Sequence, residues 1–100
     1  MYSINNKIPN EKLSQFCKTN HIAKLALFGS ALRDELRPDS DIDLLVQFET
    51  GQAPGLMGLA KIELTLTGML GRKVDLRTPT ELSRYFRDSV LAKARTEYAA

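Results

Sequence analysis

The sequence predicts an α/β or α+β domain built around a small sheet of three strands. Three short apolar runs, at residues 22–28, 41–48 and 74–76, have the length and composition of buried strands. The segments around them carry helical periodicity with helix-start and helix-stop residues, which gives the order α-β-α-β-α-β-α. One hundred residues suit a single domain, 1–100, with one core.

The first half of the chain is expected to alternate short helices and strands. Pro9 opens a helix, and the strand that follows is apolar apart from Lys24. Gly29 and Ser30 end that strand, and Arg37-Pro38-Asp39-Ser40 is typical of a turn. The expected elements are a helix over 9–19, a strand over 22–28, a helix over 31–36, a turn over 37–40, a strand over 41–48 and a loop over 49–55.

The second half contains one ambiguous segment. Residues 56–70 show both strand-like alternation and helical spacing, but fifteen residues exceed a normal strand, so length favours a helix. Gly71 is expected to cap it before the strand at 74–76. Thr78-Pro79-Thr80-Glu81 is a good helix start, and a final helix or helix pair is expected to reach about Tyr98.

Composition excludes several classes of protein. The hydrophobic content of 43% and the charged content of 26% are ordinary for a globular protein, and a net charge of +2 gives no electrostatic argument for nucleic-acid binding. Cys17 is the single cysteine, which excludes an intrachain disulfide. No apolar run approaches the ~20 residues of a membrane span. We therefore expect a cytoplasmic protein.

Asp41 and Asp43 are the most informative pair of residues. On a strand they point to the same face, about 6.5–7 Å apart at their Cα atoms, while Ile42 and Leu44 point to the core. Two carboxylates at this spacing can hold hard cations, which prefer oxygen ligands. The alternative for this motif alone is a strand with one solvated face. An EF-hand loop that begins at Asp39 is excluded, because its sixth position is Leu44 and its twelfth is Thr50.

Gly29 and Ser30 form a candidate phosphate-binding turn. They lie between a buried strand and a predicted short helix, where backbone N–H groups and the helix dipole favour an anion. Arg33 follows one helical turn later, where it could reach a phosphate or form a surface ion pair. A plain helix cap would also explain Gly-Ser. Together with paired carboxylates on the next strand, however, the turn predicts a site for a triphosphate bridged by Mg²⁺.

The combined pattern resembles a known signature. Leu27-Phe28-Gly29-Ser30, ten further residues and then Asp41-Ile42-Asp43-Leu44 is similar to the motif of the DNA-polymerase-β-like nucleotidyltransferases, and in particular to their minimal prokaryotic members. Gly71-Arg72-Lys73-Val74-Asp75-Leu76 is similar to their third strand. The likeness covers residues 22–78 well. It departs from the pattern at Asp34, where many minimal members have glycine.

The resemblance implies a nucleotidyltransferase fold, in which a small mixed sheet of at least three strands carries helices on one face and metal-binding acids on the other. It also implies roles for particular residues. Gly29 and Ser30 would bind ATP, and Asp41 and Asp43 would bind one or two Mg²⁺ ions. Asp75 would complete the metal site and help deprotonate the acceptor.

The resemblance also implies a partner and an activity. Minimal members pair with a helical HEPN-type toxin, and they act as antitoxins that transfer AMP to a tyrosine of that toxin; this suggests a hetero-oligomer. Two alternatives stay open: a non-catalytic module that covers its partner, and an enzyme that modifies a small molecule such as an antibiotic. Tyr85 and Phe86 are expected in core or interface contacts rather than in base stacking.

Overall fold

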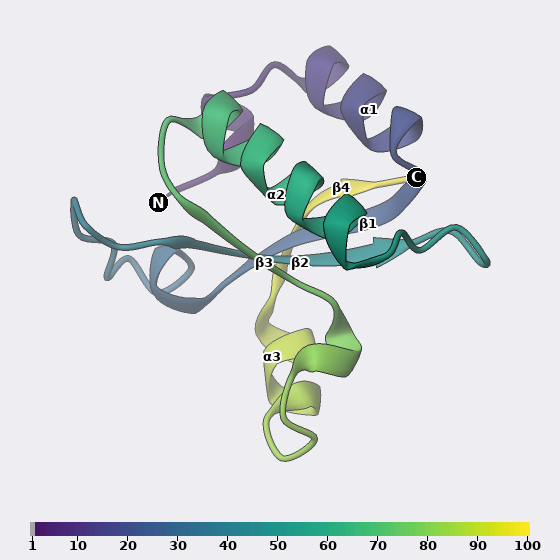
Figure 1. Cartoon of the computed structure of the whole chain (residues 1–100). Helices are drawn as coiled ribbons and strands as arrows, with labels where there is room; N and C mark the ends of the chain where they lie inside the picture. Colours follow the sequence, from purple (N-terminus) through teal and green to yellow (C-terminus); the bar gives the residue numbers. More distant parts are fainter. Residues whose placement is uncertain (1) are drawn as a thin grey trace.

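The computed structural model describes residues 2–100 and confirms the predicted α/β class with a four-stranded mixed sheet (Figure 1). Its strands are ordered β3-β2-β1-β4. The α-helices and strands, with the short 3-10 helices η2 and η3, are α1 (Asn10–Thr19), β1 (Ile22–Phe28), η2 (Gly29–Ala31), β2 (Ile42–Phe48), α2 (Leu56–Leu70), β3 (Val74–Arg77), η3 (Pro79–Glu81), α3 (Arg87–Lys93) and β4 (Arg95–Ala99).

The sheet combines antiparallel and parallel pairing. The central strand β1 pairs antiparallel with β2 on one side and with β4 on the other. β3 joins β2 in parallel, which requires a crossover connection, and α2 provides it. The assignment of residues 56–70 as a helix is thereby confirmed. Gly71 caps α2 in the left-handed conformation, with φ 69°, as the sequence predicted.

The main core lies between the sheet and the helices α1 and α2, which cover one face (Figure 1). Ile42, Leu44 and Val46 of β2 alternate onto this face and are fully buried, against Leu66 of α2 and Leu13 of α1 in the same cluster. Asp43 therefore points to the opposite face. The alternation that the sequence predicted for β2 is confirmed.

The C-terminal part of the chain corrects two expectations. α3 lies on the other side of the sheet from α1 and α2, so the helices are not all on one face (Figure 1). The final helix does not reach Tyr98, because Ala94 adopts extended dihedrals and residues 95–99 form β4. β4 fills the free edge of β1, where the antiparallel pairing provides backbone hydrogen bonds that a longer helix would have left unpaired on β1.

The predicted helix over residues 31–36 is also wrong. Only the 3-10 helix η2 forms, and Asp34 then takes a left-handed backbone conformation with φ 57°. A non-glycine residue in that region ends a right-handed helix. The second strand begins at Ile42, so Asp41 lies just before it.

Two side chains of α2 accept hydrogen bonds from backbone N–H groups on the outer edge of β3. The hydroxyl of Thr67 accepts a hydrogen bond from the N–H of Val74 at 3.0 Å, and Oε2 of Glu63 accepts one from the N–H of Leu76 at 2.8 Å. These acceptors are one helical turn apart, and they match the two-residue repeat of outward N–H groups on an edge strand. The pair fixes β3, and with it Asp75, against α2.

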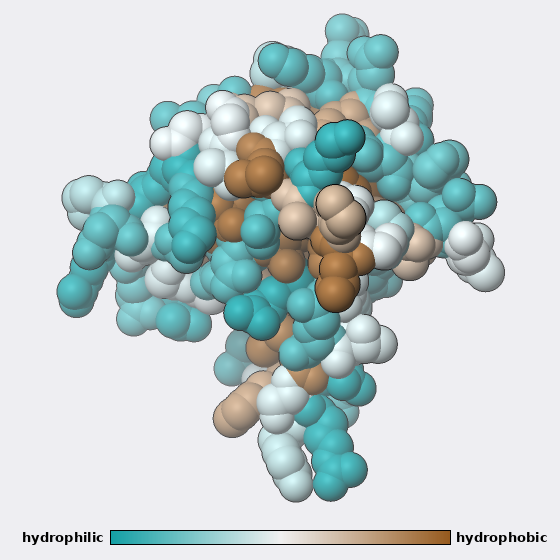
Figure 2. All heavy atoms as spheres, in the orientation of Figure 1, coloured by the Kyte–Doolittle hydropathy of each residue, from teal (hydrophilic) through white to brown (hydrophobic). Residues whose placement is uncertain are grey.

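The surface carries exposed apolar residues on two elements (Figure 2). Leu56, Met57 and Leu64 project from α2, and Tyr85 and Phe86 precede α3 with exposures of 79% and 66%. Tyr85 and Phe86 are therefore not core residues. A search of residues 2–100 for a helix with the length and apolarity of a membrane span finds none.

Candidate active site

The structure brings the three predicted acids to neighbouring positions on the sheet. Asp43 lies in β2, and its register partner in the parallel strand β3 is Asp75. Asp41 precedes Asp43 by two residues, and the backbone N–H of Ile42 between them donates to the carbonyl of Lys73 at 2.9 Å. Strand pairing, rather than sequence proximity, places Asp75 beside Asp43.

Gly29 packs directly against the central acid. Phe28 is the register partner of Asp43 across β1 and β2, so the turn that begins at Gly29 lies beside that carboxylate. A Cβ atom at Gly29 would lie 2.2 Å from Oδ2 of Asp43, far inside van der Waals contact. Gly29 also has φ +77°, which favours glycine. Two independent constraints therefore require glycine here.

The neighbouring acids affect the pKa of Asp43. The pKa of Asp43 is raised above its ordinary value, first by burial and then by the negative charges of Asp75 and Asp41. Arg77 and Arg33 act in the opposite direction. The carboxylates are thus close enough to repel, which is the condition that a bound cation would relieve.

Each flanking acid faces a basic side chain of the protein. Asp41 Oδ2 lies 3.9 Å from Nζ of Lys73, and Asp75 Oδ2 lies 3.3 Å from Nη2 of Arg77. Within residues 2–100 no three acidic, histidine or cysteine side chains converge as a finished metal centre would. Asp41, Asp43 and Asp75 have the right oxygen ligands for a hard divalent cation, and they are the residues that could hold one.

Arg33 forms the surface ion pair that was one of its two expected roles, and its contact with a phosphate stays a prediction. Its Nε forms a 2.5 Å ion pair with Glu35, which is the surface pairing. Its charge also lowers the pKa of Asp43, so Arg33 lies near the acids. Ser30 is half-buried in η2, next to Gly29.

Asp34 occupies a position that suits glycine. Its φ of 57° lies in the left-handed region, which favours glycine. Asp and Asn are among the few non-glycine residues that tolerate this region. An aspartate at this position is therefore compatible with the left-handed turn after η2.

Two site residues were missed from the sequence. Arg72 donates from Nη2 to the carbonyl of Arg37 and, at 3.1 Å, to that of Ser40, and so holds the turn that leads into Asp41. Arg77 pairs with Asp75. The sequence signal for Arg77 was its spacing of two residues from Asp75 on one strand. The partners of Arg72 lie 32 and 35 residues away, so only the fold reveals them.

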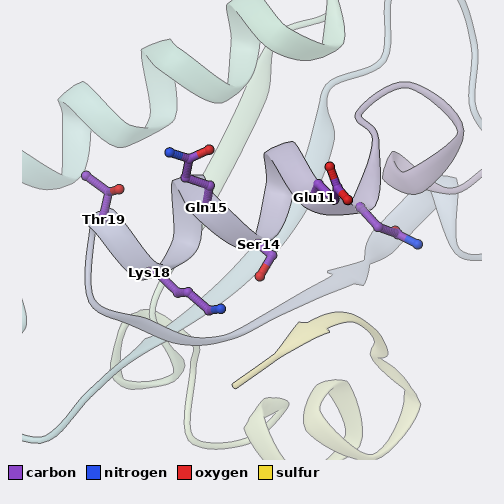
Figure 3. Close-up of a pocket in the computed structure, with 6 residues that line it drawn as sticks. Glu11, Ser14, Gln15, Lys18 and Thr19 are labelled. Carbon is purple, nitrogen blue, oxygen red and sulfur yellow. The ribbon is translucent and has the colours of Figure 1, made fainter.

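Other hollows on the surface are not part of this site. The pocket in Figure 3 is lined by Asn10, Glu11, Ser14, Gln15, Lys18 and Thr19, all from the single helix α1. It is an open surface hollow along one helix, on the face of the sheet away from the acids. A different cavity, of about 410 Å³, adjoins Gly29 and Arg33.

Comparison with known proteins indicates the family of the chain. Residues 10–97 match the model of the nucleotidyltransferase domain family. The chain is 36% identical over 70 residues to the protein adenylyltransferase MntA of Thermococcus cleftensis, and the alignment covers 70% of this chain and 69% of that relative.

Solved structures share the fold. A structure assigned to a minimal nucleotidyltransferase is 38% identical, with a TM-score of 0.69 and coverage of 84% of each chain. A complex of an MNT antitoxin with the tri-AMPylated HEPN toxin of Shewanella oneidensis matches at 18% identity with a TM-score of 0.63, covering 90% of this chain and 69% of that one. At that identity the second likeness concerns the fold alone.

Proposed function

The chain belongs to the nucleotidyltransferase domain family and is a nucleotidyltransferase, and from that premise we propose that it transfers AMP from ATP to a hydroxyl group of a partner protein. One observation carries the proposal. The turn at Gly29 lies against the carboxylate of Asp43, which itself lies in register with Asp75. A phosphate-binding turn and a set of acids thus meet at one point on the sheet.

The phosphate-binding side is assigned to Gly29, Ser30 and Arg33. The first N–H groups of a helical turn have no partner within the turn and suit phosphate oxygens. The absence of a Cβ at Gly29 lets a phosphate approach the backbone next to Asp43. The guanidinium of Arg33 would exchange Glu35 for a phosphate oxygen.

The acid side is assigned to Asp41, Asp43 and Asp75, which would hold Mg²⁺. When bound, Mg²⁺ supplies charge stabilisation of the phosphate oxygens and of the departing pyrophosphate. Asp75, at the edge of the group, receives the proton of the attacking hydroxyl as that oxygen bonds to the α-phosphorus. The bond from the α-phosphorus to the bridging oxygen breaks, and pyrophosphate leaves.

The proposed acceptor is a tyrosine of a HEPN-type toxin, so that the chain acts as an antitoxin. The names of its relatives support this acceptor: one is a protein adenylyltransferase, and a fold neighbour is an antitoxin bound to an AMPylated HEPN toxin. The exposed apolar residues Leu56, Met57 and Leu64 provide surface for a protein partner.

The test is transfer to a HEPN-type protein encoded beside this chain. The two proteins are incubated with Mg²⁺ and each nucleoside triphosphate in turn, and the partner is weighed by intact mass spectrometry. We expect a gain of one or more AMP masses with ATP, and no gain with Asp43→Asn. A stable complex without any mass gain would refute transfer and identify the chain as a non-catalytic binding module.

A further inference from the structure

A cavity of about 410 Å³ lies between η2 and the segment that includes α3. We propose that it binds the nucleoside part of the nucleoside triphosphate, with the ring of Phe86 against the base. The inference rests on the proposed function and extends it by naming a specificity-determining residue. The cavity is lined by Phe28, Gly29, Leu32, Arg33, Leu82, Ser83, Phe86, Val90 and Lys93.

The cavity is continuous with the candidate active site. Phe28 and Gly29 line it, and these are the residues that meet Asp43 through strand register and direct packing. A molecule with its phosphates at Gly29 therefore has this cavity within reach of its remaining atoms. The cavity volume lies within the range of about 300–1,000 Å³ that is usual for small-molecule sites.

The lining has two kinds of chemistry. Leu32, Leu82 and Val90 present apolar side chains, which suit the faces of a heteroaromatic base. Arg33 and Lys93 add two cations from opposite walls, one from η2 and its following turn and one from the end of α3. An apolar chamber flanked by cations matches a ligand with an apolar ring at one end and phosphates at the other.

Phe86 is an aromatic residue with an exposed side chain at this cavity. It is 66% exposed, although burying a phenylalanine side chain would stabilise the fold. The neighbouring Tyr85 is 79% exposed but does not line the cavity, and Arg84 lies 5.3 Å from the centre of its ring. Phe86 lines the cavity together with Phe28, and its exposed ring, unlike that of Tyr85, is placed to stack on a base.

The segment that carries Phe86 is held in place by Arg87. Its Nε donates to the carbonyl of Pro79 at 2.8 Å, and its Nη2 donates to that of Leu82 at 3.1 Å. α3 contains no buried residue, so these bonds to η3 and its flank fix the wall of the cavity. A preformed wall lowers the ordering cost of binding a base.

The experiment compares two ligands on three proteins by isothermal titration calorimetry in Mg²⁺. The ligands are ATP and inorganic tripolyphosphate, which has the phosphates without a nucleoside. The proteins are the unaltered chain, Phe86→Ala and the matched control Tyr85→Ala. We expect Phe86→Ala to weaken ATP binding about 5- to 150-fold, the range of base–aromatic stacking, and to leave tripolyphosphate binding unchanged. Tyr85→Ala should change neither ligand by more than about twofold.

Each other outcome has a distinct meaning. Equal weakening of both ligands by Phe86→Ala would overturn the inference, because the effect would not concern the nucleoside. Unchanged ATP affinity with a raised KM for the partner protein would also overturn it and would assign the cavity to the acceptor. If the unaltered chain binds neither ligand, the proposed function itself fails. If Asp43→Asn abolishes transfer but Phe86→Ala leaves ATP affinity unchanged, this inference is refuted and the proposed function is retained.

Discussion

Replacement of Gly29 by alanine tests the packing of the proposed phosphate-binding turn against the carboxylate of Asp43. Two separate effects are expected to lower the free energy of unfolding of this variant. The left-handed φ of +77° costs an alanine about 1–2 kcal/mol. The new methyl would also lie 2.2 Å from Oδ2, 3.0 Å from Cγ and 3.1 Å from Cβ of Asp43. Rotation of the carboxylate can relieve the contact with Oδ2 but not the contact with Cβ. We therefore add about 1 kcal/mol, the low end for overpacking, to the loss of unfolding free energy.

Gly51 provides a matched control. It has nearly the same φ, +76°, and within residues 2–100 no atom beyond its two chain neighbours lies within 4 Å of its Cβ position. Gly51→Ala should therefore lose about 1–2 kcal/mol of unfolding free energy, and Gly29→Ala about 2–3 kcal/mol, both measured by urea unfolding. Transfer activity should fall at least about 100-fold in Gly29→Ala only, because the carboxylate is displaced by about 1 Å or more.

A double variant isolates the contact. In an Asp43→Gly background, which also removes the Cβ atom, the steric part should vanish, so that Gly29→Ala costs about as much as Gly51→Ala. If Gly29→Ala and Gly51→Ala lose equal stability in the unaltered background, Asp43 does not pack on Gly29. Full retention of transfer activity in Gly29→Ala would refute the reasoning about the site.

Three further predictions concern the core, the edge strand and the metal. Burial raises the pKa of Cys17 to about 12, so the fold disfavours the thiolate. Relative to Cys17→Ala, the unaltered protein should keep its full stability below pH ~8.5 and lose up to about 1.4 kcal/mol per pH unit from there toward pH 12, as measured by urea unfolding; a constant difference would contradict this. Glu63→Ala leaves the N–H of Leu76 unpaired and should cost about 1–3 kcal/mol, whereas Glu63→Gln keeps an acceptor and should cost less than half as much; equal losses would exclude the hydrogen bond. Saturating Mg²⁺ should raise the Tm, by the equivalent of about 2.7 kcal/mol at 100 times its Kd, and the Asp41→Asn/Asp43→Asn variant should show no such rise.

Several features were readable from the sequence because they depend on local rules. The alternation of Asp43 with Ile42 and Leu44 assigned the acid to one face and the core residues to the other, and the structure agrees. Length identified α2, and a glycine after its last turn identified the cap at Gly71. These features follow from backbone periodicity and from the steric freedom of glycine, which do not need a partner element.

Other features depended on partners that are distant in the chain. Residues 95–99 continue a helical pattern, but they form β4 because the free edge of β1 offers backbone hydrogen bonds. Phe86 is not a core residue, because it is 66% exposed beside a cavity, whereas its expected interface contact stays a prediction. The hydrogen bond from Arg87 to the carbonyl of Pro79, which helps to fix this segment, depends on the fold.

The candidate site also combines features set by local sequence with features set by the tertiary structure. The sequence by itself determined which residue types could bind phosphate and metal, since Gly29-Ser30 and Asp41-x-Asp43 are local motifs whose chemistry is set by their spacing. Only the tertiary structure decided that Asp75 stands beside Asp43, that Gly29 packs on the same carboxylate, and that Arg72 holds the turn before Asp41. These relations arise from strand register and from side chains that meet across tens of residues, and local periodicity carries no information about either.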